Sequence, residues 1–305
     1  MKKIGITGGS GLLGKLLAKE FQRKKISYSL FNGDITNKKH INFWLSKNYE
    51  IEYIFHFAAY TVAEKSKENK KKAFKINVLG TKNLLNVINL KKKKRHLFFS
   101  SSSHVYSYSK KPIKESFTLK PSSYYGKTKL LAEKKIIKNK GVNFSYCIAR
   151  IFSIYHKNQK KHFLYPSMKQ KLKKLKSNKI HIKGANNLRD FTNAEKIVKI
   201  IIKIFKKKLV GVYNIGSGKG MTIKEFINKT AKIIKLKIQW KGKGLNEVAV
   251  NQFGKTIVSI DKKYFRPLEV DYLRGDASKA KKYLKWKIKN SIDDLIKQMV
   301  KYELD

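Results

Sequence analysis

The chain has 305 residues and a formal net charge of +51, from 71 lysines and arginines against 20 acidic residues. Its hydrophobic fraction of 41% is typical of a globular protein and excludes an intrinsically disordered one. The single cysteine, Cys147, excludes an internal disulfide framework and is typical of a reducing compartment. The start is too rich in glycine for a signal peptide, and no apolar run is long enough to span a membrane. We therefore expect a cytoplasmic protein with no membrane partner.

The positive charge is spread along the whole chain, and almost all of it is lysine. A protein that binds nucleic acid more often clusters arginine and interleaves it with aromatic residues. The basic run at 91–95 is most simply the charged end of a helix and the loop after it. We interpret the charge as solvated surface and expect no specific nucleic-acid partner. A non-catalytic regulatory or RNA-associated protein remains the alternative class.

Short apolar strands alternate with amphipathic helices over the first half of the chain. The first strand, at 2–7, leads through glycines into a helix within 8–24, and after about residue 152 the alternation loosens. This order predicts an α/β fold, in which helices wrap both faces of a parallel sheet and a smaller C-terminal lobe is built from several segments. Further strands are predicted over 26–31, 52–59, 96–101, 143–152 and 211–218, and further helices over 38–48, 72–90, 124–139 and 222–235.

Gly8, Gly11 and Gly14 follow the first strand and open the first helix. In such a turn the first glycine permits the bend, the second lets a pyrophosphate approach, and the third lets the helix pack on the strand. The phosphates then meet free N–H groups at the positive end of the helix. The pattern predicts a Rossmann-like dinucleotide site, with a plain tight turn as the structural alternative. A second glycine cluster, at 216–220, lacks the preceding glycine of a phosphate loop and the Ser or Thr directly after its lysine, and we interpret it as a loop at a strand end.

Tyr125 stands four residues before Lys129, which places both side chains on one face of a predicted helix. A neighbouring ammonium can make a phenol usable as an acid and base near neutral pH. The same spacing occurs four times in the chain, however, and composition alone predicts about three occurrences. The pair therefore needs support from its context. The other three pairs are Tyr106/Lys110, Tyr165/Lys169 and Tyr283/Lys287.

Several segments in order resemble the extended short-chain dehydrogenase/reductase family, which includes nucleotide-sugar epimerases, dehydratases and 4-ketoreductases. The glycine turn, "FSSSSHVY" at 99–106 and "YYGKTK" at 124–129 are similar to its catalytic segments, which makes the other tyrosine–lysine pairs accidents. The stretch at 266–286 is closest to the GDP-sugar branch. Further similar segments are "GDIT" at 33–36, "HFAAY" at 56–60, "INVLGT" at 76–81, "RIFSIY" at 150–155, "RDF" at 189–191 and "VYNIGSG" at 212–218.

The resemblance implies a Ser-Tyr-Lys active site with NAD or NADP as the cofactor. Tyr125 would exchange a proton with the sugar 4-oxygen, Lys129 would lower the tyrosine pKa, and Ser102 would stabilise charge on that oxygen. The implied cofactor-binding residues are Gly8, Ser10, Gly11, Leu12, Gly14, Asn32, Asp34, Ile35, Phe57, Ala58, Ala59, Asn77, Tyr125 and Lys129. The implied substrate-binding residues are Ser103, Ser153, Arg189 and Arg266, of which the arginines would hold the diphosphate.

The resemblance also implies how the chain is organised. Residues 1–152 would form the dinucleotide-binding Rossmann domain, with a returning segment near 190–216. Residues 153–305 would mainly form the substrate-binding lobe, interleaved with that domain. The partner would be a nucleotide-diphosphate sugar, GDP- or dTDP-linked, and helices around 73–90 and 124–139 would form a homodimer.

The two residues directly after Ser102 narrow the set of possible reactions. The 4,6-dehydratases of the family carry an Asp-Glu pair there, and the glutamate removes the C5 proton. In this chain the two positions hold Ser103 and His104. Since neither is a carboxylate, we expect an epimerase or a 4-keto-6-deoxysugar reductase rather than a dehydratase. His104 is a less favoured substitute base.

The chain departs from the family near the expected cofactor ribose. Only one strand fits between the first helix and the segment at 33–36, so the second ribose-binding loop is shortened. The usual ribose-binding acid aligns with Asn32, which does not repel a 2′-phosphate, so NAD and NADP both stay open. Lys24 and Lys25 would lie near such a phosphate. Ser153 and His156 replace the usual Asn and Gly at the substrate phosphates.

Overall fold

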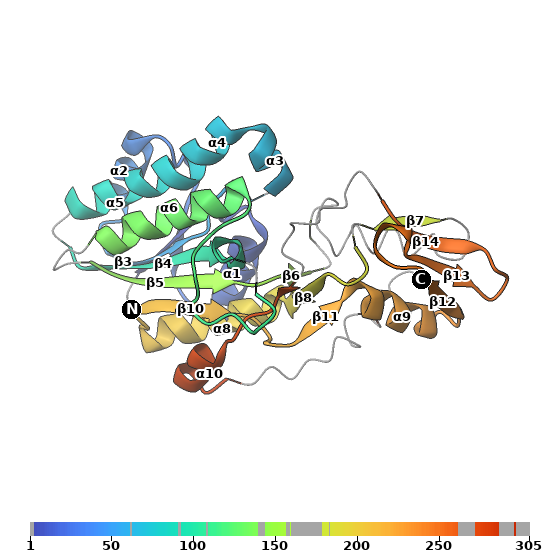
Figure 1. Cartoon of the computed structure of the whole chain (residues 1–305). Coiled ribbons are helices and arrows are strands. Elements are labelled where there is room, and N and C mark those ends of the chain that lie inside the picture. The colour runs from blue at the N-terminus through green and yellow to red at the C-terminus, as the bar shows by residue number, and fades with distance from the viewer. Residues whose placement is uncertain are drawn as a thin grey trace.

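The computed structural model describes residues 3–61, 63–90, 93–107, 109–139, 144–156, 159, 179–182, 184–261, 272–286 and 296. Its central sheet has six strands in the order β10-β5-β4-β3-β1-β2 (Figure 1). Every neighbouring pair is parallel, as the alternation of strands and helices predicts. The strands are β1 Lys3–Thr7, β2 Tyr28–Phe31, β3 Ile51–His56, β4 Arg95–Ser102, β5 Phe144–Ile151 and β10 Gly211–Ile215.

The inner strands of this sheet are buried on both faces. Ile54, Phe55, Leu97 and Phe98 have no exposed surface. Continuous apolar runs of this kind are typical of parallel strands that helices cover on both sides. The apolar strands thus dictate the layered arrangement around them.

Helices cover both faces of the sheet (Figure 1). α2, α5 and α6 pack on one face through residues such as Leu45, Leu84 and Ile136. α1, α8 and α10 pack on the other, through residues such as Leu17 and Ile201. The doubly wound α/β fold is therefore confirmed. The helices are α1 Leu12–Arg23, α2 Lys38–Lys47, α3 Ala63–Glu68, α4 Lys70–Phe74, α5 Gly80–Leu90, α6 Tyr124–Lys138, α8 Ala194–Lys207, α9 Ile223–Ile233 and α10 Ser278–Leu284.

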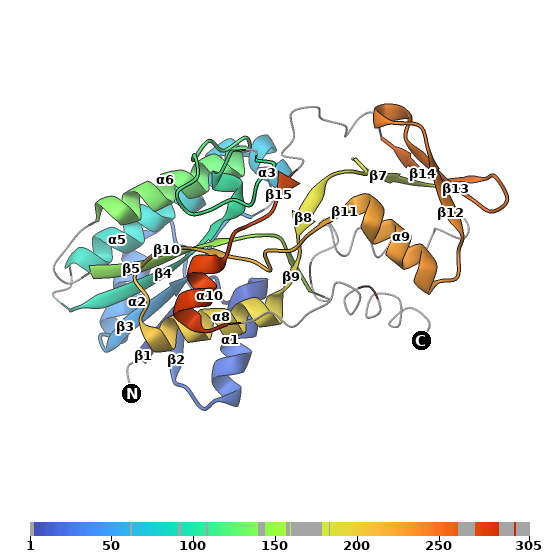
Figure 2. The same ribbon diagram turned by 60° about the horizontal axis from the view of Figure 1, so that its bottom comes forward.

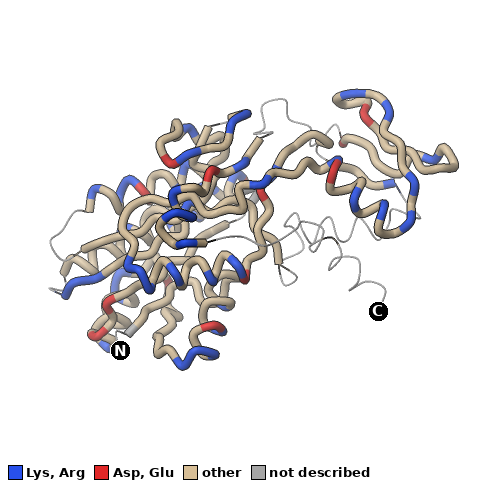
Figure 3. Tube along the Cα trace, turned by 90° about the horizontal axis from the view of Figure 1, so that it is seen from below, with Lys and Arg blue, Asp and Glu red and all other residues tan. Residues whose placement is uncertain are grey.

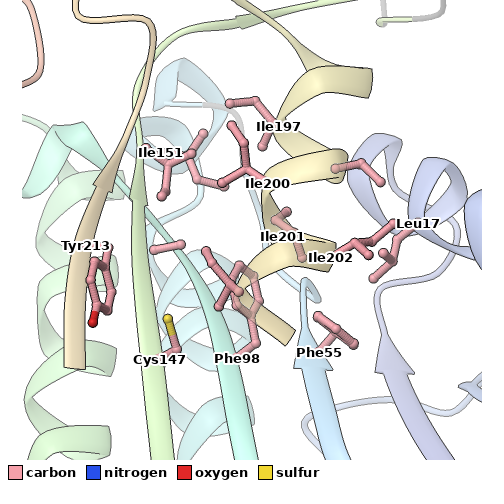
Figure 4. Packing of buried hydrophobic residues seen from close by; sticks show 14 of the residues in the cluster. Leu17, Phe55, Phe98, Cys147, Ile151, Ile197, Ile200, Ile201, Ile202 and Tyr213 are labelled. Carbon is pink, nitrogen blue, oxygen red and sulfur yellow. The ribbon is translucent and has the colours of Figure 1, made fainter. Parts of the chain in front are cut away.

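Helix α8 is strongly amphipathic, yet it is missing from the elements predicted above. Asn193 caps its start by accepting a backbone N–H two residues later. Figure 4 shows Ile197 and Ile201 of α8 on the side of the helix that faces Phe55 and Phe98 of the sheet. The helix returns the chain to the central sheet, where β10 then adds the edge strand.

The long helix expected over 72–90 is interrupted. Lys75–Leu79 form a π-helical segment between α4 and α5. Such segments widen one turn of the helix and often occur at functional sites. Asn77 lies in this segment and is 2% exposed.

Smaller sheets lie beyond the carboxyl ends of the central strands (Figure 2). One has the order β12-β13-β14-β7, and α9 packs on it through Phe226 and Ile227. Another has the order β11-β8-β15, and β6 pairs with β9. Of these elements only α9 is predicted from the sequence. The strands are β6 Ile154–Tyr155, β7 Ile180–Ile182, β8 Leu188–Asp190, β9 Thr192–Asn193, β11 Gly220–Thr222, β12 Ile238–Lys241, β13 Val248–Asn251, β14 Thr256–Ile260 and β15 Tyr272–Leu273.

Lysine and arginine are distributed over the whole of the described chain. Figure 3 shows them on the helices around the central sheet and on the smaller sheets alike. This distribution is what a solvated basic surface requires. Among the described residues, no helix has both the length and the apolar character needed to cross a membrane.

Candidate active site

The candidate site lies where the strand order of the central sheet reverses. β1 has β2 on one side and β3 on the other. In open α/β sheets, ligands bind at such a switch point, outside the carboxyl ends of the strands. Three segments expected at the site follow those ends: the glycine turn after β1, Phe57 to Ala59 after β3, and Ser102 at the end of β4.

Two glycines of the turn, Gly8 and Gly14, have no room for a side chain. Gly8 has a φ of +73°, and a side chain there would collide with the backbone of Ala58. A side chain on Gly14 would collide with the carbonyl oxygen of Gly8. Gly11 is the N-cap of α1 and offers no side-chain acceptor to the N–H groups of the first turn. An anionic group can therefore bind these N–H groups at the positive end of the helix.

The other residues expected at the cofactor lie along the same edge of the sheet. Asn32 is exposed directly after β2. The Asp34 carboxylate accepts from the N–H and the hydroxyl of Thr36, each at 2.8 Å, and these bonds lower its pKa. Ile35 is 6% exposed and packs in the core. Ser10 is exposed, and Leu12, Phe57, Ala58 and Ala59 are half-buried.

The three residues expected to be catalytic meet where β4 ends and α6 begins. Ser123 caps α6 by accepting from the N–H of Gly126 at 3.1 Å, which fixes the first helical turn. Tyr125 lies in that turn, and its side chain lies near enough to Ser102 for that hydroxyl to affect the pKa of the phenol. Lys129 follows one turn later and is 3% exposed. The structure thus brings Ser102, Tyr125 and Lys129 to one place.

Burial shifts the pKa values of Tyr125 and Lys129. Desolvation raises the pKa of Tyr125 to about 12, although the hydrogen bond with Ser102 acts to lower it. Desolvation also lowers the pKa of Lys129 to about 7, while the charge of Glu133 acts to raise it. The Lys129 ammonium lies 4.4 Å from the centroid of the Phe99 ring, which is a cation–π contact. Lys129 can therefore change its protonation state near neutral pH.

A buried ion pair lies behind the site, and it is not predicted from the sequence. Glu133 is fully buried one turn after Lys129, and Arg150 of β5 donates to its carboxylate at 2.7 Å. Ser101 donates to the same carboxylate. Arg150 also donates to the hydroxyl of Tyr106 at 3.0 Å. We call Ser101, Tyr106, Glu133 and Arg150 the charged network; it fastens α6 to β4 and β5.

A second polar cluster near α6 carries no charge. The Asn77 side chain accepts from the N–H of Tyr60 at 2.7 Å and donates to the hydroxyl of Thr128 at 2.9 Å. Thr128 precedes Lys129 and donates to the carbonyl of Tyr125 at 2.8 Å. Asn77 therefore ties the loop after β3 to the first turn of α6. The sequence identifies Asn77 as a site residue, but it does not identify Thr128.

His104 lies beside Ser102 and Tyr125. The His104 ring meets the Tyr125 ring edge-on, with 5.9 Å between the centroids. Its backbone N–H donates to the Ser102 hydroxyl at 3.3 Å. Burial lowers the pKa of His104, and the charge of Arg189 adds to this effect, although the imidazole keeps solvent access. The charge of Arg189, a substrate-binding candidate, thus acts on His104, whose ring meets Tyr125.

The remaining substrate-binding candidates are less closely grouped. Ser103 is 2% exposed next to Ser102. Ser153 is half-buried just after β5, and its carbonyl accepts from the N–H of Thr192 at 2.9 Å. His156 pairs with Glu195 at 3.3 Å. Arg266 lies outside the described residues, so its contact stays a prediction.

The second glycine cluster, at 216–220, is a loop between β10 and β11, as predicted. The buried Asp190 carboxylate accepts from the N–H groups of Ser217 and Gly218, each at 2.8 Å. These groups are therefore satisfied by protein and do not form a phosphate loop. Asp190 was not identified from the sequence.

Of the other tyrosine–lysine pairs, Tyr106/Lys110 is the one that lies wholly within the described residues, and it does not resemble the pair on α6. Tyr106 is 1% exposed within the charged network, whereas Lys110 is exposed to solvent. Tyr283 is 52% exposed on α10. Lys287 and the pair Tyr165/Lys169 lie outside the described residues.

Solved structures show to which class this fold belongs. RMD from Pseudomonas aeruginosa, complexed with NADPH, has a TM-score of 0.80 and 20% identity, and the match covers 99% of this chain and 97% of that one. UDP-glucose 4-epimerase from Thermotoga maritima, solved with UDP-glucose, has a TM-score of 0.81 and 20% identity, covering 99% and 98% of the two chains. At such identities the likeness shows the fold alone. The fold is that of the extended short-chain dehydrogenases/reductases, as the sequence resemblance implies.

A family model defines the relationship more narrowly. The chain belongs to the GDP-mannose 4,6 dehydratase family, whose model matches residues 6–299. GDP-mannose 4,6 dehydratase 2 from Caenorhabditis elegans is 26% identical over 281 residues, which cover 90% of this chain and 73% of that protein. Across the curated relatives compared, the chain spans between 33% and 82% of their lengths. The suspected family is thereby confirmed.

Proposed function

We propose that this chain is an NAD(P)-dependent oxidoreductase acting at C4 of a nucleotide-diphosphate sugar. The observation that carries this proposal is the meeting of Ser102, at the end of β4, with Tyr125 in the first turn of α6, one helical turn from the buried Lys129. Membership of a family named for a GDP-sugar supports the substrate class. The fold neighbour from Thermotoga, solved with UDP-glucose, supports it as well.

The residues of the glycine turn fit a dinucleotide. Gly8 and Gly14 let the turn pack against Ala58 and against itself without a side chain between, and the first-turn N–H groups of α1 have no side-chain cap. In this proposal the glycine turn holds the pyrophosphate, Asn32 the adenosine ribose and Lys129 the nicotinamide ribose. The bound nicotinamide supplies the hydride acceptor or donor for the sugar carbon. Because Asn32 is uncharged, the site accepts NAD or NADP, and the neighbour RMD was solved with NADPH.

The proton chemistry belongs to α6 and the end of β4. Tyr125 exchanges a proton with the sugar 4-oxygen, and Ser102 donates a hydrogen bond to the same oxygen. Because the pKa of Tyr125 is raised to about 12, its deprotonation near neutral pH requires a positive charge nearby. Lys129, with a pKa of about 7, supplies that charge when protonated. Arg189, Arg266, Ser103 and Ser153 hold the substrate diphosphate and sugar in this proposal.

We propose epimerisation or 4-ketone reduction as the reaction, because dehydration also needs a base at C5. The positions after Ser102 hold Ser103 and His104 rather than a carboxylate. Glu133, on the helix of Tyr125, is fully buried and engaged by Arg150. Glu133 is therefore not a substitute base.

A second candidate is 4,6-dehydration, which the name of the family favours. His104 is then the base at C5, because its ring meets Tyr125 and keeps solvent access. This candidate makes a 4-keto-6-deoxysugar from GDP-mannose without net consumption of cofactor. The two candidates thus differ in their products.

The test begins with the nucleotide released when the freshly purified protein is denatured. Retained NAD(H) favours epimerisation, whereas an empty protein that binds NADPH on titration favours ketone reduction. The protein is then incubated with GDP- and dTDP-linked 4-keto-6-deoxysugars and NADPH, and with nucleotide hexoses alone. Consumption of NADPH, or interconversion of 4-epimers, supports the proposal. A 4-keto-6-deoxysugar formed from GDP-mannose supports the second candidate.

Tyr125→Phe is the decisive variant. Removing a general acid–base should lower kcat by a factor of about 10² to 10⁴, while dinucleotide affinity stays unchanged. Tyr283→Phe, an exposed tyrosine that also precedes a lysine by four residues, is the matched control and should keep full activity. Undiminished turnover in Tyr125→Phe would contradict the proposed mechanism.

A further inference from the structure

A buried histidine connects the glycine turn with the helix that carries Tyr125 and Lys129. His56 ends β3 beside Thr7 of β1, and its side chain has no exposed surface. Its Nδ1 lies 2.6 Å from Thr7 Oγ1, and its Nε2 lies 3.0 Å from Thr81 Oγ1. Nothing in the chemistry proposed above uses this residue.

The hydrogen bonds around His56 have a definite direction. Thr81 Oγ1 lies 2.7 Å from the carbonyl oxygen of Asn77, and a carbonyl can only accept. The Thr81 hydroxyl therefore donates to Asn77 and accepts from the Nε2–H of His56. A neutral imidazole carries one N–H, so its Nδ1 accepts from the hydroxyl of Thr7. The Nε2–H tautomer satisfies every polar atom of Thr7, His56 and Thr81 that the arrangement brings together.

Both ends of this arrangement reach the candidate site. Thr7 directly precedes Gly8, the first glycine of the turn. At the other end, Asn77 donates to Thr128, which itself donates to the carbonyl of Tyr125. We call Thr7, His56, Thr81, Asn77 and Thr128 the neutral network. It runs from the glycine turn to the first turn of α6, entering Asn77 at its backbone carbonyl and leaving through its side-chain amide.

His56 stays uncharged at physiological pH. Burial lowers its pKa to about 3, and the positive charge of Lys129 adds to this effect. A protonated imidazole would donate from both nitrogens and would turn the Thr7 hydroxyl away. The directed set of bonds therefore depends on the neutral ring.

We propose that His56 is a positioning residue that couples the glycine turn to α6, so that a nucleotide held by the turn orders the helix carrying Tyr125 and Lys129. This inference rests on the proposed function, since that function assigns a nucleotide to the turn. The physical reason is that a buried polar group left without its partner keeps the full cost of its lost hydration. The members of the network therefore keep their bonds by moving together. When a bound nucleotide orders Thr7, the network also orders Thr128. Less conformational entropy then remains to be lost when α6 takes up its final position.

The test uses amide hydrogen exchange in α6, with ADP as the probe. ADP carries the adenosine and pyrophosphate but no nicotinamide, so it occupies the turn without contacting Tyr125. In the wild-type protein, saturating ADP should slow exchange in residues 124–138 by at least about fivefold, the lower end of typical coupling between sites. Thr81→Val removes the hydroxyl between His56 and Asn77 with little change in volume. In that variant ADP should still bind, but the slowing should disappear.

The chain offers a matched control for Thr81. Thr230 in α9 has no exposed surface and donates to the carbonyl of Phe226 at 2.9 Å, the same bond to the residue four positions earlier that Thr81 makes. Thr230→Val removes an equivalent buried hydroxyl away from the site. It should keep the full effect of ADP on α6.

Each other outcome overturns a defined claim. If Thr81→Val keeps the slowing, or if ADP binds to the wild type without slowing exchange in α6, the coupling is wrong while the proposed function stands. If ADP does not bind to the wild type, the proposed function is wrong, and the inference fails with it. Should Thr81→Val not fold, nitrogen NMR of the wild type decides. His56 should be the Nε2–H tautomer and should not titrate between about pH 5 and 8; the other tautomer, or a titrating ring, would overturn the inference.

Discussion

The charged and neutral networks both hold α6, but they differ in what they fasten it to. The charged network joins Glu133 to Arg150, and so fixes the middle of the helix to the central sheet. The neutral network joins Thr128 to His56 and Thr7, and so fixes the first turn to the glycine turn. Separating a buried ion pair leaves an uncompensated charge, whereas breaking a neutral bond leaves only an unpaired dipole. The comparison indicates that the charged network provides stability, whereas the neutral network couples the glycine turn to α6.

The largest effect is expected from the charged network. Arg150→Met leaves the buried Glu133 without its partner, which should lower the free energy of unfolding by about 3–5 kcal/mol in urea denaturation. Arg23→Met, which removes an exposed partner of Glu20, is the control and should change stability little. Adding Glu133→Gln to Arg150→Met should restore part of the loss. Equal small effects of Arg150→Met and Arg23→Met would refute the assigned role.

A pH-dependent effect, smaller than this for each pH unit, is expected at Lys129, which lies between the two networks. Its folded pKa of about 7 is below the ordinary value of 10.5, so the unfolded chain binds more protons between these pH values. The free energy of unfolding should therefore rise with pH in this window, by up to about 1.4 kcal/mol per pH unit from this group. Lys129→Met should remove that slope. Lys127→Met, at an exposed position of the same helix, should retain it.

Urea denaturation of the three proteins at several pH values between neutral and pH 10 measures this slope. An identical slope in Lys129→Met and the wild type would show that Lys129 titrates normally. The desolvation of Lys129 would then have no net effect on its protonation.

The smallest effect on stability is expected in the neutral network. Thr128→Val removes one acceptor for Asn77 and one donor to Tyr125, and should cost about 1 kcal/mol of stability. If this network couples the glycine turn to α6, turnover should fall by more than the loss of folded protein explains. Denaturation and steady-state kinetics on the same preparation compare the two quantities. A variant that is less stable yet fully active would show that the neutral network provides stability and does not couple the glycine turn to α6.

The parts of the site that the sequence predicts are those set by local geometry. Gly8 and Gly14 are recognisable because a tight turn excludes side chains there, whatever lies elsewhere in the chain. Tyr125 and Lys129 are recognisable because four residues make one helical turn. The resemblance to a known family then selects this pair among four. The same reasoning correctly predicts the parallel sheet.

The parts that the sequence does not predict depend on partners far away in the chain. Arg150 occurs in a strand of apolar residues, which signals a buried partner, but nothing local identifies Glu133. His56 is a strand residue in the sequence, and its tautomer follows only from the positions of Thr7 and Thr81. The spacing of Ile197 and Ile201 could have revealed the helix α8. It could not have shown that α8 packs on the central sheet. The proposed division into a dinucleotide-binding domain and a substrate-binding lobe, and the homodimer, stay predictions.

The late return of the chain to its first sheet affects how the protein is made. β5 ends at Ile151, but the edge strand β10 begins only at Gly211, and the core beneath α1 also uses α8 and Trp286. A chain emerging from the ribosome therefore exposes Phe55 and Phe98 until these segments follow. Exposed apolar surface of this kind promotes association between unfinished chains. The net charge of +51 opposes such association by mutual repulsion, so the lysines that surround this fold protect it while it is incomplete.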